Sequence, residues 1–459
     1  MPGFWERKTS LLGTASPFAV EGRVREMSGL VIKASAMPIP VGSVCRIRRA
    51  SGGGEMEAEV VGFRGDETLL MTYGDPRGIA RGDRVKFHLS SSTVAVGDGL
   101  LGRVMGGLGQ PIDGKGDLPG VERRPLYAGA PDPVFRRRIH EPMGTGVKAI
   151  DSMLTFGRGQ RVGIFAGSGV GKSVLLGMIA RHTDADVSVV ALVGERGREV
   201  REFLERDLGE SGLRRSVVVV ATSDEPALVR VRAALVATAI AEYFRDAGKN
   251  VVLLMDSLTR IAIALREIGL SAGEPPATRG YPPSMFAFMP RLLERTGTSR
   301  TGSITGIYAV LVEADDMTEP VADTARSILD GHVWLDRGLF IKGQFPAVDP
   351  LASISRVMRD VVTKEHFDAA ARLRRILAAY RGAEDLIQVG AYVKGANSDV
   401  DAAIPLMPGV RAFLSQGMDD YLTFDETVKE LKALVAEKAG TVPAAPPAPR
   451  RKANAAVQV

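Results

Sequence analysis

The sequence predicts an α/β protein with a central P-loop core, preceded by a small β-barrel and followed by a helical domain. Between residues 96 and 370, buried apolar runs alternate with amphipathic helical segments, which is typical of a doubly wound α/β domain. Residues 21–95 contain short strand-like runs separated by glycine-rich turns, and residues 371–437 are mostly helix formers. We therefore expect three structured domains, with a short segment at each end of the chain.

The composition is that of an ordinary globular chain, with 45% hydrophobic and 25% charged residues. The net charge of +5 is small for this length, so it does not argue for a nucleic-acid partner. Cys45 is the single cysteine, and the five histidines lack metal-ligand spacing, so we expect neither a disulfide within the chain nor a zinc or iron site. The opening sequence MPGFWERKTS has no apolar signal core and no run is long enough to span a bilayer, which favours a cytoplasmic protein.

The two ends of the chain are predicted to lie outside the folded domains. In residues 1–20, Phe4, Trp5, Leu11 and Leu12 would share one face of a helix, so this segment is either a frayed terminus or an amphipathic docking segment. Residues 438–459 are dominated by proline and alanine and cannot form a core, so we expect a disordered tail.

Within the domains, the apolar runs predict individual elements. The expected barrel strands are residues 57–63, 67–73 and 84–89. The expected parallel strands of the core are residues 187–193, 216–221 and 251–255, with a long amphipathic helix over residues 227–247.

A phosphate-binding loop follows the apolar run at residues 162–166. The sequence AGSGVGKS at residues 166–173 leads directly into a helical run, which is the setting that a Walker A motif requires. The glycines let backbone N–H groups face phosphate oxygens, Lys172 supplies a cation for the β- and γ-phosphates, and Ser173 offers a hydroxyl to Mg²⁺. Ala166 stands where the strict pattern has glycine, and we expect this small residue to be tolerated. The predicted nucleotide-binding residues of the loop are Gly167, Ser168, Gly169, Val170, Gly171, Lys172 and Ser173.

Two carboxylates end predicted strands at the ligand-facing edge of the core. Asp256 follows the run 251–255, where it could hold a Mg²⁺-bound water, although a helix N-cap is an alternative role. Glu195 follows the run 187–193, and its carboxylate could orient and polarise the attacking water. The charged residues 198–206 behind it are expected to form a solvated helix with i,i+4 ion pairs.

Motifs spread in order over most of the chain resemble those of the rotary ATP synthase superfamily, which implies a RecA-like P-loop core. Two further stretches, GERGREVREFLE and EADDMTEPVADTARSILDGH, look most like the flagellar type III protein export ATPases, and are also similar to the ATPases of virulence injectisomes. The superfamily motifs are GRVMGGLGQPIDGKG (102–116), GVKAIDSMLTF (146–156), GIFAGSGVGKS (163–173), GERGREV (194–200), MDSLTR (255–260) and PAVDPLASISR (346–356).

The resemblance implies further catalytic roles. Glu195 matches the catalytic glutamate of the family, and Arg196 and Arg260 match arginines close to the terminal phosphates. Arg356 matches an arginine finger that a neighbouring subunit donates, where a delocalised cation stabilises charge on the transferring phosphoryl group.

The resemblance also implies an adenine site and an assembly. Phe345 and Tyr392 match aromatic positions that sandwich adenine, although ordinary loop packing is an alternative for both. A finger donated in trans implies a closed ring, and the family precedent is a homohexamer that hydrolyses Mg·ATP. The implied partners are a stator-like regulator at the N-terminus, a coiled-coil stalk protein, export chaperone–substrate complexes at the C-terminal helices, and a membrane export gate reached only through partners. The protein would then be cytoplasmic and peripheral to the inner membrane.

Three other functions remain open from the sequence. The chain could be a subunit of a rotary ATP synthase, a ring translocase of RNA, or a non-catalytic ring subunit, which Glu195 argues against. An RNA translocase would need exposed aromatic stacking platforms, for which the barrel offers mainly Phe63, Tyr73 and Phe87.

Overall fold

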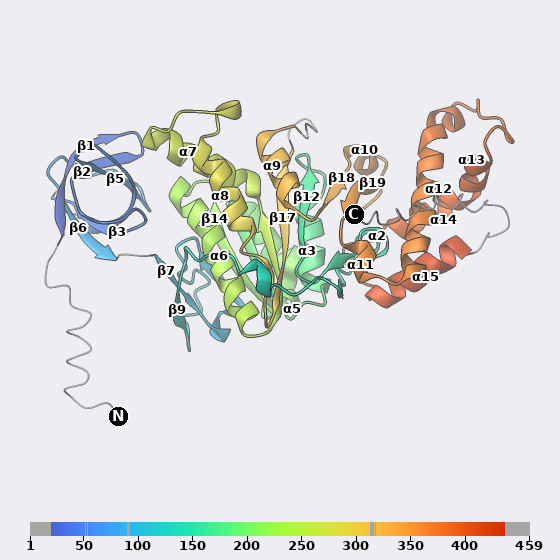
Figure 1. Cartoon of the computed structure of the whole chain (residues 1–459), viewed down its shortest axis with the longest axis horizontal. Coiled ribbons are helices and arrows are strands. Elements are labelled where there is room, and N and C mark those ends of the chain that lie inside the picture. The colour runs from blue at the N-terminus through green and yellow to red at the C-terminus, as the bar shows by residue number, and fades with distance from the viewer. Residues whose placement is uncertain are drawn as a thin grey trace, which may run out of the picture.

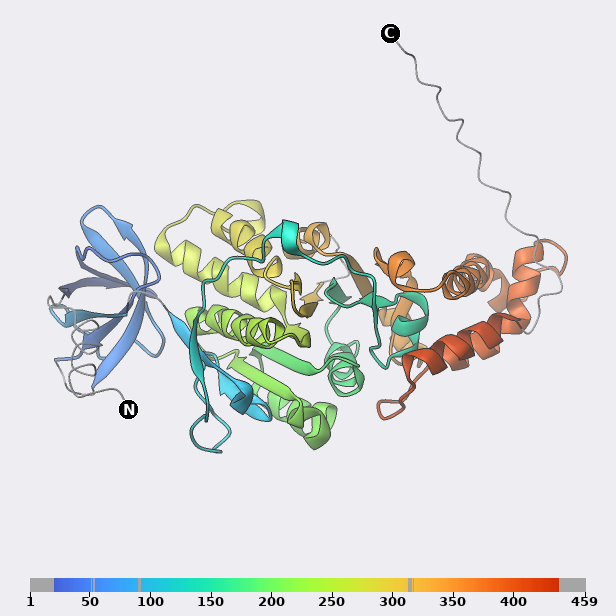
Figure 2. The same ribbon diagram turned by 60° about the horizontal axis from the view of Figure 1, so that its bottom comes forward.

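The computed structural model describes residues 20–436, except 51, 53, 90, 91, 313–315 and 317. Three regions follow one another along the long axis of the molecule: a β-barrel, an α/β core and a group of helices (Figures 1 and 2). The predicted fold class is therefore confirmed. The expected docking segment at residues 1–20 and the expected tail at residues 438–459 lie outside the described residues, apart from residue 20.

The N-terminal region is a closed barrel with the strand order β1-β2-β5-β4-β3-β6. Alternate residues of its strands point inward, so that Ile32, Ile47, Val60, Leu70 and Val85 fill the interior. Closure leaves no free strand edge in the barrel. The strands are β1 (Glu21–Ser28), β2 (Val31–Ser35), β3 (Val44–Arg48), β4 (Glu55–Arg64), β5 (Glu67–Thr72) and β6 (Arg84–Leu89).

The core is built on one sheet with the strand order β19-β18-β12-β17-β15-β13-β14-β8. Its neighbouring strands are parallel from β18 to β8, whereas β19 runs antiparallel to β18 at the edge. The carboxyl ends of the parallel strands therefore meet at one edge, where α/β proteins bind ligands. The strands are β8 (Arg103–Gly106), β12 (Arg161–Ala166), β13 (Val187–Glu195), β14 (Ser216–Thr222), β15 (Asn250–Asp256), β17 (Ser303–Leu311), β18 (Gly331–Leu335) and β19 (Val348–Ser355), with β16 (Gly297–Thr298) paired to β17.

Helices cover both faces of the sheet, because the buried strands are apolar on both sides. In β13, Val189 and Ala191 pack toward α6, α7, α8 and α9, whereas Val190 and Leu192 pack toward α2 and α3. The helices of the core are α2 (Lys148–Met153), α3 (Lys172–His182), α4 (Gly197–Glu202), α5 (Gly209–Arg214), α6 (Ala227–Asp246), α7 (Leu258–Ala272), α8 (Pro283–Leu293), α9 (Pro320–Ile328), α10 (Arg337–Ile341) and α11 (Met358–Val361). Short strands β7 (Thr93–Val96) and β9 (Glu122–Pro125) pair beside the core, as do β10 (Pro142–Met143) and β11 (Phe156–Gly157).

The C-terminal region begins with the longest helix, α12 (Lys364–Gln388). The boundary expected between residues 370 and 371 falls inside this helix, because its true start is the N-cap Thr363, whose hydroxyl accepts from the amide of His366. The first turns of α12 pack on the core, where the His366 ring contacts the carbonyl of Ser152. The remaining helices are α13 (Ser398–Ala403), α14 (Met407–Leu414) and α15 (Phe424–Ala436). None of the helices in the described ranges is long and apolar enough to cross a bilayer.

A buried polar cluster joins the barrel to the core. The Glu59 carboxylate of β4 accepts from the hydroxyls of Tyr73 at 2.6 Å and Tyr127 at 2.9 Å. Arg232 of α6 approaches the same carboxylate at 3.8 Å and donates to the Tyr73 hydroxyl at 3.0 Å. Burial raises the pKa of Glu59, while the three partners oppose that rise. Since Tyr73 is buried in this junction, its ring is not available for stacking on RNA bases.

Candidate functional site

The loop between β12 and α3 forms an open cradle at the ligand-facing edge of the sheet. The strand ends at Ala166 and the helix begins at Lys172. Gly169 and Gly171 have φ angles of 79° and 90°, which side chains disfavour, and nothing lies within 4 Å of the space that a Cβ atom would fill at either position. Such a run of backbone N–H groups ahead of a helix N-terminus suits phosphate oxygens.

Three ionisable side chains converge beside this loop. Lys172 is buried, and its Nζ donates to the Asp256 carboxylate and lies 3.7 Å from Glu195 Oε1. The two acids come from adjacent parallel strands, in which Leu192 of β13 pairs with Asp256 of β15. The structure thus brings together the cation and both carboxylates that the sequence placed at the site.

The environment of Glu195 changes its acidity. Burial, followed by the nearby negative charge of Asp256, raises the pKa of Glu195 to about 7, although Lys172 opposes the rise. A carboxyl group with a pKa near neutrality can exchange a proton with water close to physiological pH. Glu195 therefore has the acidity expected of a general base.

Arg260 also lies at this site. The Ser257 hydroxyl caps α7 by accepting from the amide of Arg260 at 3.4 Å, which fixes the first turn of the helix. Gly194 makes room for the arginine, because a Cβ atom there would stand 2.8 Å from the Arg260 Cβ. The Nε atom of Arg260 is buried without a hydrogen-bond partner. An unsatisfied buried donor of this kind fits an anionic ligand such as a phosphate.

The two remaining predicted arginines are exposed. Arg196 precedes α4 and pairs with Glu199 at 3.3 Å. Arg356 follows β19, and its amide donates to the carbonyl of Asp330. The amide of Asp330 in turn donates to the carbonyl of Arg161, the first residue of β12. Arg356 is thus separated from the loop of its own chain by the length of β12, about 20 Å. The structure does not bring Arg356 to the site within one chain.

The two predicted aromatic residues do not lie together. Phe345 is 48% exposed, packs edge-to-face on Phe340, and its carbonyl accepts from the amide of Gln416. Tyr392 lies beyond the end of α12, where its hydroxyl donates to Asp401 of α13 and its ring lines a crevice between these helices. Of the two, only Phe345 lies close to β19 in the chain, three residues before its first residue, which pairs with the end of β18 at the ligand-facing edge.

One contact to the loop was not predicted. Arg337, the first residue of α10, donates from Nη2 to the carbonyl of Ser168 at 3.3 Å. The sequence contained no signal for this contact, because 169 residues separate its partners and a lone arginine after a strand has many roles.

The residues present fit a nucleotide with Mg²⁺. This ion keeps several waters and takes its protein ligands from one or two side chains together with phosphate oxygens. The Ser173 hydroxyl at the start of α3 and the Asp256 carboxylate are oxygen ligands of this kind. Among the described residues, no group of three or more His, Cys, Asp or Glu side chains is arranged to hold a metal ion.

Family models match all three regions of the chain. The nucleotide-binding domain of the ATP synthase alpha/beta family matches residues 146–355, and the β-barrel domain of that family matches residues 24–88. The flagellum-specific ATP synthase of Bacillus subtilis is 54% identical over 90% of this chain and 94% of its own length. The chain belongs to the ATP synthase alpha/beta family. Within this family, the model of the C-terminal domain of the type III secretion ATPase EscN matches residues 362–433.

Other members of the ATP synthase alpha/beta family are nearly as similar. The type 3 secretion system ATPase of Xanthomonas euvesicatoria is 51% identical over 90% of this chain and 93% of its own. The assembled ATPase EscN of enteropathogenic E. coli superposes with a TM-score of 0.86 at 45% identity, covering 90% of this chain and all of the chain in that structure. EscN in complex with its central stalk EscO gives a TM-score of 0.83 at 44% identity, with the same coverage. The resemblance predicted from the motifs is thus confirmed.

Proposed function

We propose that this protein hydrolyses Mg·ATP at the boundaries between identical subunits of a homohexameric ring and thereby drives type III protein export, most directly of flagellar components. The enzyme is a protein-secreting ATP phosphohydrolase in this proposal.

The observation that carries the proposal is the separation of Arg356 from the rest of the site. Lys172, Asp256 and Glu195 gather at the carboxyl edge of the sheet, whereas Arg356 lies at the amino edge of the same sheet. An exposed arginine in this position can complete only the site of another subunit. A closed ring gives every site such a neighbour.

The chemistry follows from the positions of the side chains. Glu195 accepts the proton of a water molecule whose oxygen forms a bond to the γ-phosphorus, while the bond to the β,γ-bridging oxygen breaks and ADP leaves. Lys172 turns from Asp256 to the β- and γ-phosphates, and Arg196, Arg260 and the neighbour's Arg356 stabilise the charge that develops. Ser173, and Asp256 through a water molecule, would hold Mg²⁺, which would neutralise charge on the phosphates. Phe345 provides one stacking face for adenine, and Tyr392, which lies apart from it, is a weaker candidate.

The relatives support flagellar export first and injectisome export second. The flagellum-specific relative in Bacillus subtilis is 54% identical and the type 3 secretion relative in Xanthomonas euvesicatoria is 51% identical, so the margin is small. We therefore keep the ATPase of a virulence injectisome as the second candidate. Restoring motility in a bacterium that lacks its flagellar export ATPase would support the first candidate, whereas restoring only injectisome secretion would support the second.

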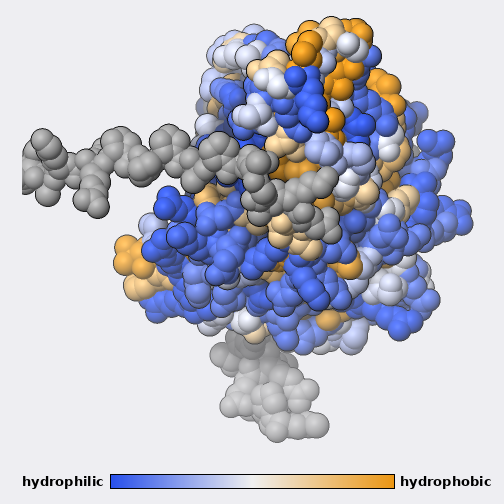
Figure 3. Space-filling model, turned by 90° about the vertical axis from the view of Figure 1, so that its right-hand side faces the viewer, coloured by the Kyte–Doolittle hydropathy of each residue, from blue (hydrophilic) through white to orange (hydrophobic). Residues whose placement is uncertain are grey.

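The C-terminal helices offer the surface for protein partners. Leu386 in the last turn of α12, and Val389 and Val393 after its end, are 52%, 75% and 70% exposed. Figure 3 looks onto this end of the molecule, where hydrophobic side chains gather at the top of the view. Export chaperone–substrate complexes would bind here, and a coiled-coil stalk protein would bind the ring. EscN is known in complex with a central stalk, EscO. A stator-like regulator would bind the N-terminal segment, so that the cytoplasmic ring reaches the inner-membrane export gate only through partners.

Mixed rings test the proposal directly. Arg356→Ala subunits mixed with an equal number of Glu195→Gln subunits should release phosphate at about a quarter of the wild-type rate, although neither variant is active alone, since an Arg356→Ala site can receive an intact arginine from a Glu195→Gln neighbour. A wild-type protein that releases no phosphate from Mg·ATP would refute the activity. A mixture of Arg356→Ala and Glu195→Gln subunits that stays as inactive as either variant alone would refute the action of Arg356 in trans.

A further inference from the structure

A single strand connects the subunit's own site to the site of its neighbour. Phe345 lies three residues before β19 begins, and Arg356 follows its last residue. The first residue of β19, Val348, pairs with Leu335 at the ligand-facing edge, whereas Ser355 pairs with Gly331 at the opposite edge. Whatever fixes β19 therefore fixes a residue of each site.

The strand is interrupted by a bulge that Asp349 organises. Asp349 pairs with Trp334 and Ile354 pairs with His332, so the four residues between Asp349 and Ile354 bulge out of the ladder. The Ser353 hydroxyl donates to the Asp349 carbonyl at 2.6 Å, and the Leu351 amide donates to the Asp349 carboxylate at 2.9 Å. Asp349 thus sets the path of the chain toward Arg356.

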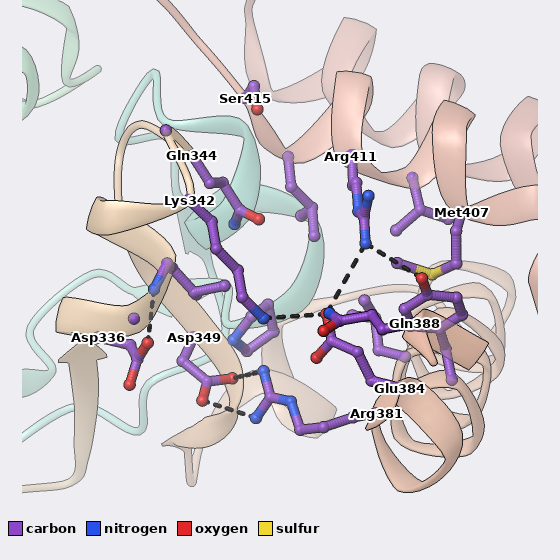
Figure 4. A pocket seen from close by; sticks show the side chains of 18 residues that line it. Asp336, Lys342, Gln344, Asp349, Arg381, Glu384, Gln388, Met407, Arg411 and Ser415 are labelled. Carbon is purple, nitrogen blue, oxygen red and sulfur yellow. Dashed lines mark hydrogen bonds and ion pairs between the residues drawn. The ribbon is translucent and has the colours of Figure 1, made fainter. Parts of the chain in front are cut away.

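An arginine of the C-terminal helices holds this aspartate from outside the core. Asp349 is 4% exposed, and Arg381 of α12 donates to both of its oxygens, at 2.8 and 3.0 Å (Figure 4). Such two-pronged pairs fix orientation as well as distance. Arg374, two turns earlier on α12, donates to the carbonyl of Ser353 at 3.4 Å. One helix therefore contacts both sides of the bulge.

Around these contacts the core and the C-terminal helices share apolar packing, but a cavity also lies between them. A cavity of about 660 Å³ lies between α10 and β19 on one side and α12 and α14 on the other. The ion pair of Lys342 with Glu384 at 2.9 Å crosses it, while Arg411 lies 3.9 Å from Glu384 on the helical side (Figure 4). The Arg381–Asp349 pair therefore forms a direct polar link between α12 and β19 beside this cavity, in addition to the apolar packing between the two regions.

We propose that Arg381 is a positioning residue, which holds the bulge of β19 in place through Asp349. The bulge then determines the position of Arg356 at the neighbouring subunit's site and the position of Phe345 at the subunit's own site. The orientation of the C-terminal helices then controls how well a subunit serves its neighbour. This inference rests on the proposed function, because it requires hydrolysis completed in trans.

The test uses the assembled protein and an Arg381→Gln substitution. The kcat for phosphate release should fall about tenfold while KM changes less, because Arg356 acts mainly in the transition state. Arg381→Lys should recover part of the rate by restoring one donor. The matched control is Arg375→Gln on the same helix, whose side chain lines the crevice toward α13, and its kcat should stay within about twofold of wild type.

Mixing with Glu195→Gln subunits separates positioning from a general loss of structure. Such subunits do not hydrolyse ATP but still donate a normally held finger to the next site. The measured quantity is the rate of Arg381→Gln mixed with Glu195→Gln, divided by the rate of wild type mixed with Glu195→Gln in the same proportion. This quotient should rise from about 0.1 without Glu195→Gln subunits to about 0.8 when four subunits in five are Glu195→Gln.

A ratio that stays near its starting value would overturn the inference, while a wild-type protein without activity would instead overturn the proposed function. If Arg381→Gln does not assemble, Asp349→Asn carries the same test, since the amide oxygen can still accept from Leu351.

Discussion

The raised pKa of Glu195 predicts an acid limb in the rate of hydrolysis. Since kcat/KM reports the ionisation of the free enzyme, it should fall as the pH drops below about 7, where the carboxyl group of Glu195 becomes protonated and can no longer accept a proton from water. With a pKa of about 7, the ionised fraction is about tenfold greater at pH 8 than at pH 6. A glutamate of ordinary pKa would change by less than about 10% over the same range.

The assay is phosphate release at a fixed concentration of Mg·ATP from pH 5.5 to pH 9. Phosphate groups themselves titrate around pH 6, so the substrate could produce a similar limb. The residual activity of Glu195→Gln provides the control, because it retains every effect of the substrate but lacks the carboxyl group. Two results would refute this role for the raised pKa. One is a wild-type rate of phosphate release that does not change between pH 6 and pH 8, and the other is an acid limb that Glu195→Gln retains.

Three further predictions concern side chains around the site and at the barrel junction. Lys172→Ala should weaken ATP binding at least a hundredfold, measured by calorimetry, because it removes the cation for the phosphates and leaves Asp256 and Glu195 without their shared partner; a dissociation constant near that of wild type would contradict the site. Gly194→Ala should lower kcat at least tenfold with little change in assembly, since its Cβ would displace Arg260; normal turnover would show that Arg260 is dispensable. Glu59→Ala should lower the free energy of unfolding by about 2–4 kcal/mol and the thermal midpoint by several degrees, whereas removing the Tyr127 hydroxyl should cost about 1 kcal/mol. Equal thermal midpoints for the two variants would contradict a stabilising role of Glu59 at the junction of barrel and core.

The sequence predicted most of the core because its signals are local. The run 187–193 lies within β13, 251–255 within β15, and 227–247 coincides with α6 to within one residue. Buried parallel strands are apolar on both faces and alternate with amphipathic helices, so their order can be read without knowing the sheet. The phosphate-binding loop was equally clear, because its glycines, lysine and serine are neighbours in the chain.

Domain boundaries and distant contacts were harder to predict. The first two turns of α12 were assigned to the core, because helix propensity continues without a break across residue 371. The resemblance placed Tyr392 beside adenine, but its hydroxyl is engaged by α13 at a distance from Phe345. The contact of Arg337 with Ser168 depends on how β18 and β12 pair, which no local pattern encodes.

By itself, the sequence predicted a phosphate-binding loop ahead of Lys172, and it placed Glu195 and Asp256 at the ends of strands beside that loop. Only the tertiary structure decided that Arg356 faces away from the loop of its own chain, and that Arg381 holds the strand carrying it. The physical reason is that a loop motif is set by the backbone preferences of adjacent residues, whereas the direction of an edge strand depends on hydrogen bonds between segments far apart in the chain. The separation of Arg356 from the loop of its own chain therefore becomes visible only when the sheet is assembled.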